Sequence, residues 1–160
     1  MVVQAMSRCF WGWANVIRRT FYIGILLSFR SNLMRLIITF RAFAIIQALS
    51  VLATLAAPEA KMESFGLSYS NDTLLFMQFS AISQSMLAIV TFALPSWLGT
   101  NLWKAAPTYV WLSLLPFSVN LYHIISGIMA ITSAFYFENA FWLAFAFAFY
   151  SFGKRMKLRF

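Results

Sequence analysis

Four long apolar segments constrain the fold of this chain more than any other feature of its sequence. They cover residues 36–57, 74–98, 107–135 and 138–153. A helix needs about 20 mostly apolar residues to cross the hydrocarbon core of a bilayer, a length that three segments reach and the fourth approaches. Because 62% of all 160 residues are hydrophobic, which is more than a soluble domain of this size can bury, the sequence predicts an all-α membrane protein.

Capping residues and prolines mark the ends of these segments. Pro58 stops the first segment, since proline cannot continue a helix that needs its backbone N–H. Pro107 fits the first turn of the third segment, and Pro116 predicts a kink inside it. The second segment ends at Gly99. The candidate N-caps at its start are Ser70, Asn71 and Asp72.

The charges are distributed very unevenly along the chain. Four crossings would place both termini and the loop 99–106 on one side of the membrane. That side would receive eleven of the twelve basic residues, namely Arg8, Arg18, Arg19, Arg30, Arg35, Arg41, Lys104, Lys154, Arg155, Lys157 and Arg159. The other side would receive Lys61 and all four acids, which are Glu59, Glu63, Asp72 and Glu138. Because basic residues prefer one side of a membrane, this asymmetry predicts a four-transmembrane-helix bundle.

Residues 1–35 contain a further apolar stretch, which Arg18 and Arg19 interrupt. A fifth span through this stretch would bury both arginines or move the basic residues that follow it to the opposite side. We therefore expect an N-terminal amphipathic interfacial helix that lies on the membrane surface. The segment is basic and free of acids, as mitochondrial targeting segments are, and we interpret it as an uncleaved signal.

The chain thus divides into a basic interfacial segment (1–35), a four-span bundle (36–153) and a basic tail (154–160), with no linker to a second domain. The basic residues flank apolar runs, which excludes nucleic acid and favours lipid headgroups or partner subunits as contacts. The candidates for these contacts are Arg18, Arg19, Arg30, Arg35, Arg41, Lys154, Arg155, Lys157 and Arg159.

Among the polar side chains of the predicted spans, four are candidates for a site inside the membrane. Gln47, Gln84 and Asn120 lie near the midplane of their helices, and His123 follows Asn120 by three residues, so both can face the same side. One hypothesis is that the four line a site for a proton, quinone, pigment or small polar ligand. The other is that they satisfy one another between helices. We favour the second, since no intramembrane Asp or Glu accompanies them.

The sequence lacks the patterns that are typical of an enzyme. It has a single histidine and a single cysteine, Cys9, so it can form neither an intramolecular disulfide nor a recognisable metal-ligand set. It has no carboxylate pair at membrane depth and no glycine-rich phosphate loop. We therefore expect no catalytic residue, no metal and no cofactor.

The stretch ALSVLATLAAPEAKMESFGLSYSNDTLLFMQFSAI joins the first two predicted spans. It combines a polar cap before the second span with an apolar helix that ends in Pro58-Glu59 and is followed by Phe65-Gly66-Leu67. In these features residues 37–98 resemble small four-helix DoxX-like membrane proteins. The resemblance implies the four-helix architecture and no particular activity, and the basic N-terminal segment and tail lie outside it.

These features predict a non-catalytic accessory subunit of a large bioenergetic membrane complex. The basic N-terminal segment favours the mitochondrial inner membrane, and hence a respiratory complex or an ATP synthase. The expected roles are assembly, packing and the binding of cardiolipin or another anionic lipid. One alternative is an accessory subunit of a photosynthetic complex in the thylakoid membrane, with chlorophyll ligands among His123, Asn120, Gln84 and Glu138. The other is a free-standing DoxX-like carrier of small molecules or lipids.

Overall fold

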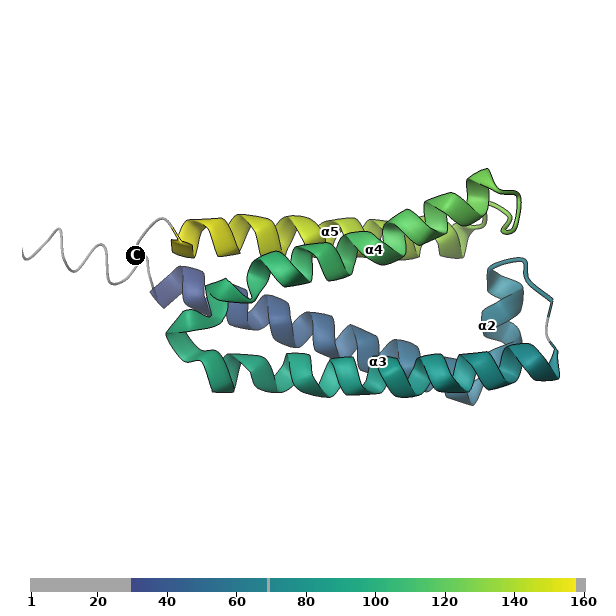
Figure 1. Ribbon diagram of the computed structural model, residues 1–160, viewed down its shortest axis with the longest axis horizontal. Helices are drawn as coiled ribbons and strands as arrows, with labels where there is room; N and C mark the ends of the chain where they lie inside the picture. Colours follow the sequence, from purple (N-terminus) through teal and green to yellow (C-terminus); the bar gives the residue numbers. More distant parts are fainter. Residues whose placement is uncertain (1–29, 69, 158–160) are drawn as a thin grey trace, which may run out of the picture.

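A computed structural model describes residues 30–68 and 70–157 of the protein (Figure 1). All regular elements in these residues are helices, which confirms the predicted all-α class for this part of the chain. The interfacial segment was predicted over residues 1–35. Residues 1–29 lie outside the described residues, and residues 30–35 belong to the first long helix, which therefore includes six residues before the predicted span. The elements are, in chain order, the first helix Arg30–Ala56, α2 (Pro58–Ser64), α3 (Asn71–Leu98), the 3-10 helix η1 (Gly99–Lys104), α4 (Ala106–Ile125) and α5 (Ser133–Lys157).

In the described part of the chain, two helices are long and apolar enough to cross a membrane. They are Arg30–Ala56, with 27 residues, and the continuous helical stretch Asn71–Lys104, with 34. This finding rests on length and composition. The arrangement of four spans therefore stays a prediction.

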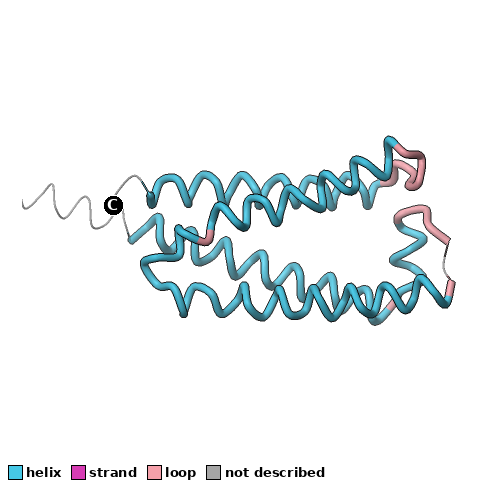
Figure 2. The backbone as a smooth tube through the Cα atoms, viewed as in Figure 1, coloured by secondary structure: helices cyan, strands magenta, loops and turns pink. Residues whose placement is uncertain are grey.

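The four long helices form two pairs (Figure 1). The first helix lies beside α3 in one pair, and α4 lies beside α5 in the other. The pairs meet at the end of the molecule that holds η1 and the last turns of α5, which we call the closed end. They diverge toward the end that holds α2 and the longer loops, which we call the open end (Figure 2). At the open end the loop after α2 reaches the other pair, since a Cβ on Gly66 would lie 3.3 Å from Ala130 Cβ.

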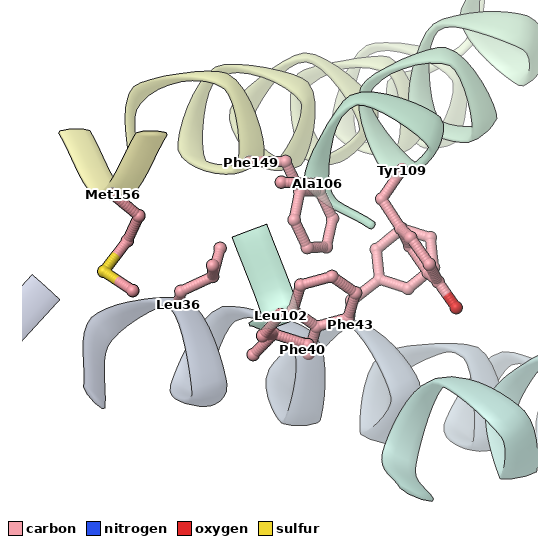
Figure 3. Close-up of a cluster of buried hydrophobic side chains, with 8 residues drawn as sticks. All are labelled: Leu36, Phe40, Phe43, Leu102, Ala106, Tyr109, Phe149 and Met156. Carbon is pink, nitrogen blue, oxygen red and sulfur yellow. The ribbon is translucent and has the colours of Figure 1, made fainter. Parts of the chain in front are cut away.

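The hydrophobic core occupies the closed end, where all the main elements except α2 and the start of α3 meet. The first helix, η1, α4 and α5 contribute buried residues to it, and Phe149 and Met156 point from α5 toward the first helix (Figure 3). Its rings pack edge to face, with centroid distances of 4.6 Å for Phe40 to Tyr109 and 4.8 Å for Phe40 to Phe149. The full set is Leu36, Phe40, Phe43, Leu102, Ala106, Tyr109, Phe149 and Met156.

Gly153 allows the closest approach within the second pair. A Cβ built on Gly153 would lie only 2.6 Å from Ala106 Cβ, so a side chain larger than hydrogen does not fit. The sequence prediction that the last helix ends near this glycine is wrong, because α5 continues to Lys157. Gly153 is buried inside the helix and serves the contact with α4, as small residues do where helices pack closely.

The boundary between α4 and α5 also differs from the prediction. The third segment was expected to reach about residue 135, but α4 ends at Ile125. Gly127 has a φ of +70°, its N–H donates to the Ile124 carbonyl (3.0 Å), and the Ile128 N–H donates to the His123 carbonyl (2.9 Å). This pattern is a Schellman motif. Because the residues after this motif are also apolar, hydropathy does not reveal that the helix ends here. The next helix, α5, begins at Ser133 instead of near residue 138.

The connection between the first helix and α3 contains a helix that the sequence analysis missed. Pro58 ends the first helix and then occupies the first turn of α2, a position that proline favours. The predicted cap of α3 is confirmed at Ser70, whose hydroxyl accepts the Thr73 N–H (3.2 Å) while the Ser70 N–H donates to the Thr73 hydroxyl (2.7 Å). The helix starts at Asn71, three residues earlier than expected, and Gly99 ends it with a φ of +50°.

Replacing Gly153 by alanine should destabilise the closed end. The added methyl group overlaps Ala106 Cβ, and overpacking of this kind costs about 1–3 kcal/mol. We expect Gly153→Ala to lower the Tm of the protein in detergent micelles. Gly153→Ala combined with Ala106→Gly should recover most of the loss, because the second change removes the overlapping atom. An unchanged Tm for Gly153→Ala, or no recovery in the double variant, would contradict this packing.

Candidate functional site

Two adjoining cavities lie between the helix pairs on the open side of the core. Their volumes are about 430 Å³ and 240 Å³. They share the lining residues Ser50, Lys61, Phe65, Gln84 and Glu138, and together we call them the inter-pair cleft. The larger cavity alone falls within the range of roughly 300–1,000 Å³ that is typical of small-molecule sites.

Aromatic side chains of α5 form most of the apolar wall of the larger cavity. Phe137, Phe141, Trp142 and Phe145 line it from α5, opposite Phe43 of the first helix. Phe43 is also a core residue, and its ring centroid lies 5.1 Å from that of Phe145 and 5.9 Å from that of Trp142. The cleft therefore begins where the core ends.

Two glutamine amides face the larger cavity from the first pair. Gln47 is only 5% exposed and Gln84 is partly buried, and both line the cavity. In the described part of the chain, neither amide group has a hydrogen-bond partner. A primary amide carries two donor hydrogens and an acceptor oxygen, and buried polar groups normally find partners. The space beside Gln47 is thus suited to a polar group of a bound molecule.

One cation and one anion also line both cavities. Lys61 comes from α2, and its ammonium lies 5.1 Å from the centroid of the Phe65 ring. Glu138 comes from α5, and its carboxylate accepts a hydrogen bond of 3.3 Å from the Trp142 indole N–H. Among the described residues that line the cleft, these are the two charged ones. The cleft therefore presents charges of both signs near the open end.

The structure brings three of the four polar residues singled out in the sequence to the inter-pair cleft and leaves His123 outside it. Gln47 and Gln84 meet at the larger cavity, and Gln84 and Asn120 line the smaller one. Asn120 also donates from Nδ2 to Asn139 Oδ1 (3.4 Å), a link between α4 and α5. His123 lines neither of these cavities, and its carbonyl accepts from the turn that ends α4.

Several polar residues of the cleft escaped the sequence analysis. Ser50 and Thr54 follow Gln47 by three and seven residues and lie on the same side of the first helix, a spacing that marks one helix face. That signal was present in the sequence. Lys61 was interpreted as a charge of the membrane surface, and Glu138 as such a charge or, under the photosynthetic alternative, as a chlorophyll ligand. Their separation of 77 residues gives no sign that the fold brings them to one cleft.

A buried hydrogen bond joins the two pairs on the core side of the cleft. The hydroxyls of Thr91 on α3 and Tyr109 on α4 lie 2.7 Å apart. Thr91 donates its single hydroxyl proton to the Leu87 carbonyl at 2.6 Å, so Tyr109 must be the donor to Thr91 Oγ1. This bond crosses between the pairs and helps to hold the closed end together.

Apart from Lys61 in α2, the basic residues that the structure describes lie toward the closed end. The first helix begins there and α5 ends there (Figure 1). Arg30, Arg35, Lys154, Arg155 and Lys157 are all exposed. The further candidate contact Arg41 is exposed as well, and its guanidinium carbon lies 5.6 Å from the ring centroid of Phe92 on α3. Arg18, Arg19 and Arg159 lie outside the described residues.

Within residues 30–68 and 70–157, no group of three or more His, Cys, Asp or Glu side chains could hold a metal ion. No family model, curated protein or solved structure matches the chain. Its function must therefore be inferred from the cleft, the core and the surface.

Loss of the Thr91–Tyr109 hydrogen bond should loosen the closed end. Thr91→Val leaves the buried Tyr109 hydroxyl without its acceptor, and Tyr109→Phe removes the donor. We expect each change to lower the stability measured by unfolding in mixed detergent micelles, by about 0.5–1.5 kcal/mol. The double variant should lose less than the sum, and Tyr122→Phe, an exposed tyrosine on the same helix, should change little. Strictly additive losses would show that the two hydroxyls do not interact.

Proposed function

We propose that the chain is a four-span membrane protein that serves as a non-catalytic accessory subunit of a large bioenergetic complex. One observation carries this proposal. Large apolar side chains point outward from all four long helices, among them Ile38 (58% exposed), Phe76 (74%), Trp111 (72%) and Phe147 (72%). Monomeric soluble proteins rarely expose apolar surface on this scale. Lipid tails and neighbouring helices would cover it in a membrane.

The small size of the core supports a role among partners. The buried hydrophobic cluster holds the pairs together at the closed end, while the pairs diverge beyond it. A bundle that packs against itself over only part of its length leaves helix faces available to other subunits. Its charged ends fit a membrane setting too, since Arg30 and Lys157 lie at one end and α2, with Glu59 and Glu63, at the other.

The mitochondrial inner membrane is the setting we favour, within a respiratory complex or an ATP synthase. The basic, acid-free sequence before residue 36 supports this choice. The basic closed end would meet anionic headgroups such as those of cardiolipin. In this role the chain would contribute packing, lipid retention and assembly.

A free-standing carrier of lipids or small molecules is the second candidate. The inter-pair cleft favours it, because a cavity of about 430 Å³ with mostly apolar lining is suited to an apolar ligand. The resemblance of residues 37–98 to DoxX-like proteins is compatible with such a carrier. An accessory subunit can also hold a lipid in a cleft, so the cavity does not separate the two candidates.

Purification of the tagged full-length chain from its native membrane in a mild detergent separates them. We expect a native gel and mass spectrometry to show the chain in a large assembly with a fixed ratio to its partners, because its exposed helix faces need protein as well as lipid. When the same assembly is mildly dissociated, the chain should be released from its partners, and the mass of the chain itself should stay the same. A monomer that moves labelled phospholipid between liposomes would contradict the accessory role and support the carrier.

A further inference from the structure

The polarity of the inter-pair cleft changes in order along its length. Phe43 and Phe145 line it next to the core, Gln47 follows one turn further along the first helix, and Ser50 and then Thr54 lie nearer the open end. From Phe43 to Thr54 the helix rises by about 16 Å. About 6 Å of this rise separates Phe43 from Gln47. The cleft therefore has room for a headgroup, the glycerol backbone and the first carbons of an acyl chain.

The charges at the open part of the cleft select the headgroup. Lys61 and Glu138 line both cavities. An anionic headgroup would therefore lie near the like charge of Glu138, and a cationic headgroup near the like charge of Lys61. An anionic headgroup would also meet the acidic side chains of the open end, which include Glu59 and Glu63 of α2. A zwitterionic headgroup satisfies both residues, with its phosphate toward Lys61 and its ammonium toward Glu138.

The unpartnered amide of Gln47 points to the same occupant. It is 5% exposed, lines the cavity, and has no hydrogen-bond partner among the described residues. The ester carbonyls of a glycerophospholipid lie between its headgroup and its acyl chains. Gln47 has the corresponding position in the cleft, between Lys61 and Phe43. The Gln47 amide N–H would find an acceptor in such a carbonyl when the lipid binds.

We propose that the inter-pair cleft binds a zwitterionic phospholipid, with one acyl chain between the helix pairs and its headgroup between Lys61 and Glu138. The second chain leaves the cleft toward the surrounding bilayer. This site lies at the open end and is distinct from the contact between the basic closed end and anionic lipid. It rests on the proposed membrane location of the chain, and it holds for an accessory subunit and a carrier alike.

Native mass spectrometry of the full chain in mild detergent tests the site. The purified protein is mixed with equal amounts of phosphatidylcholine and phosphatidylglycerol, and the lipid retained on the intact protein is counted. We expect phosphatidylcholine to be retained in preference. Lys61→Gln and Glu138→Gln should each reduce its retention by roughly tenfold, since each removes a charged partner of the headgroup. Lys104→Gln, an exposed lysine of η1 at the closed end, should leave it unchanged.

A second pair of variants tests whether the lipid chain enters the cleft. Ser50→Phe fills the space that both cavities share, and Ala48→Phe places the same ring on an exposed position of the same helix. We expect the first to abolish retention and the second to preserve it, at an equal Tm. Three results would overturn the proposal. The first is lipid retention that persists in Ser50→Phe, the second is a preference for phosphatidylglycerol that Ser50→Phe removes, and the third is that the protein retains no lipid.

Flotation with phosphatidylcholine vesicles distinguishes failure of the site from failure of the membrane location. A chain that floats with the vesicles after alkaline washing but retains no lipid in detergent lacks the cleft site and keeps its membrane location. A chain that does not float contradicts both.

Discussion

The contact between α4 and α5 at Gly153 and Ala106 is the constraint on which the rest of the structure depends. It lets the two backbones approach so closely that no Cβ fits at Gly153, and it brings Phe149 and Met156 against the first helix and η1. The ring cluster and the Thr91–Tyr109 hydrogen bond then fasten the second pair to the first. Because these contacts all lie toward one end, the pairs are free to diverge at the other. The cleft is the consequence.

The same division of the molecule organises its charges. The closed end carries the described arginines and lysines of the first helix and α5, and the open end carries α2 with its acids. In the membrane that we propose, the two ends would face opposite sides, and each would meet different lipid chemistry. Anionic headgroups suit the basic end, whereas the cleft with Lys61 and Glu138 suits a headgroup that carries both charges.

The sequence predicts the helical class and several helix ends correctly, because these depend on local chemistry. Ser70 and Gly99 bound α3 as expected, since a hydroxyl N-cap and a left-handed glycine act through their own neighbours. The end of α4 was missed because the residues after Gly127 are as apolar as the helix before it. Gly153 was misread as a helix end, since nothing local reveals that Ala106 lies against it. Lys61 and Glu138 could not be paired for the same reason, because only the divergence of the helix pairs brings them to one cavity.

We propose that the closed and open ends lie on opposite sides of a membrane. Two single-cysteine variants test it most directly, Lys157→Cys at the closed end and Ala60→Cys in α2, each with Cys9→Ser. Sealed vesicles of one orientation are treated with a thiol reagent that does not cross the membrane, before and after permeabilisation. We expect one variant to react at once and the other only after permeabilisation. Equal reaction of both variants in sealed vesicles would contradict it.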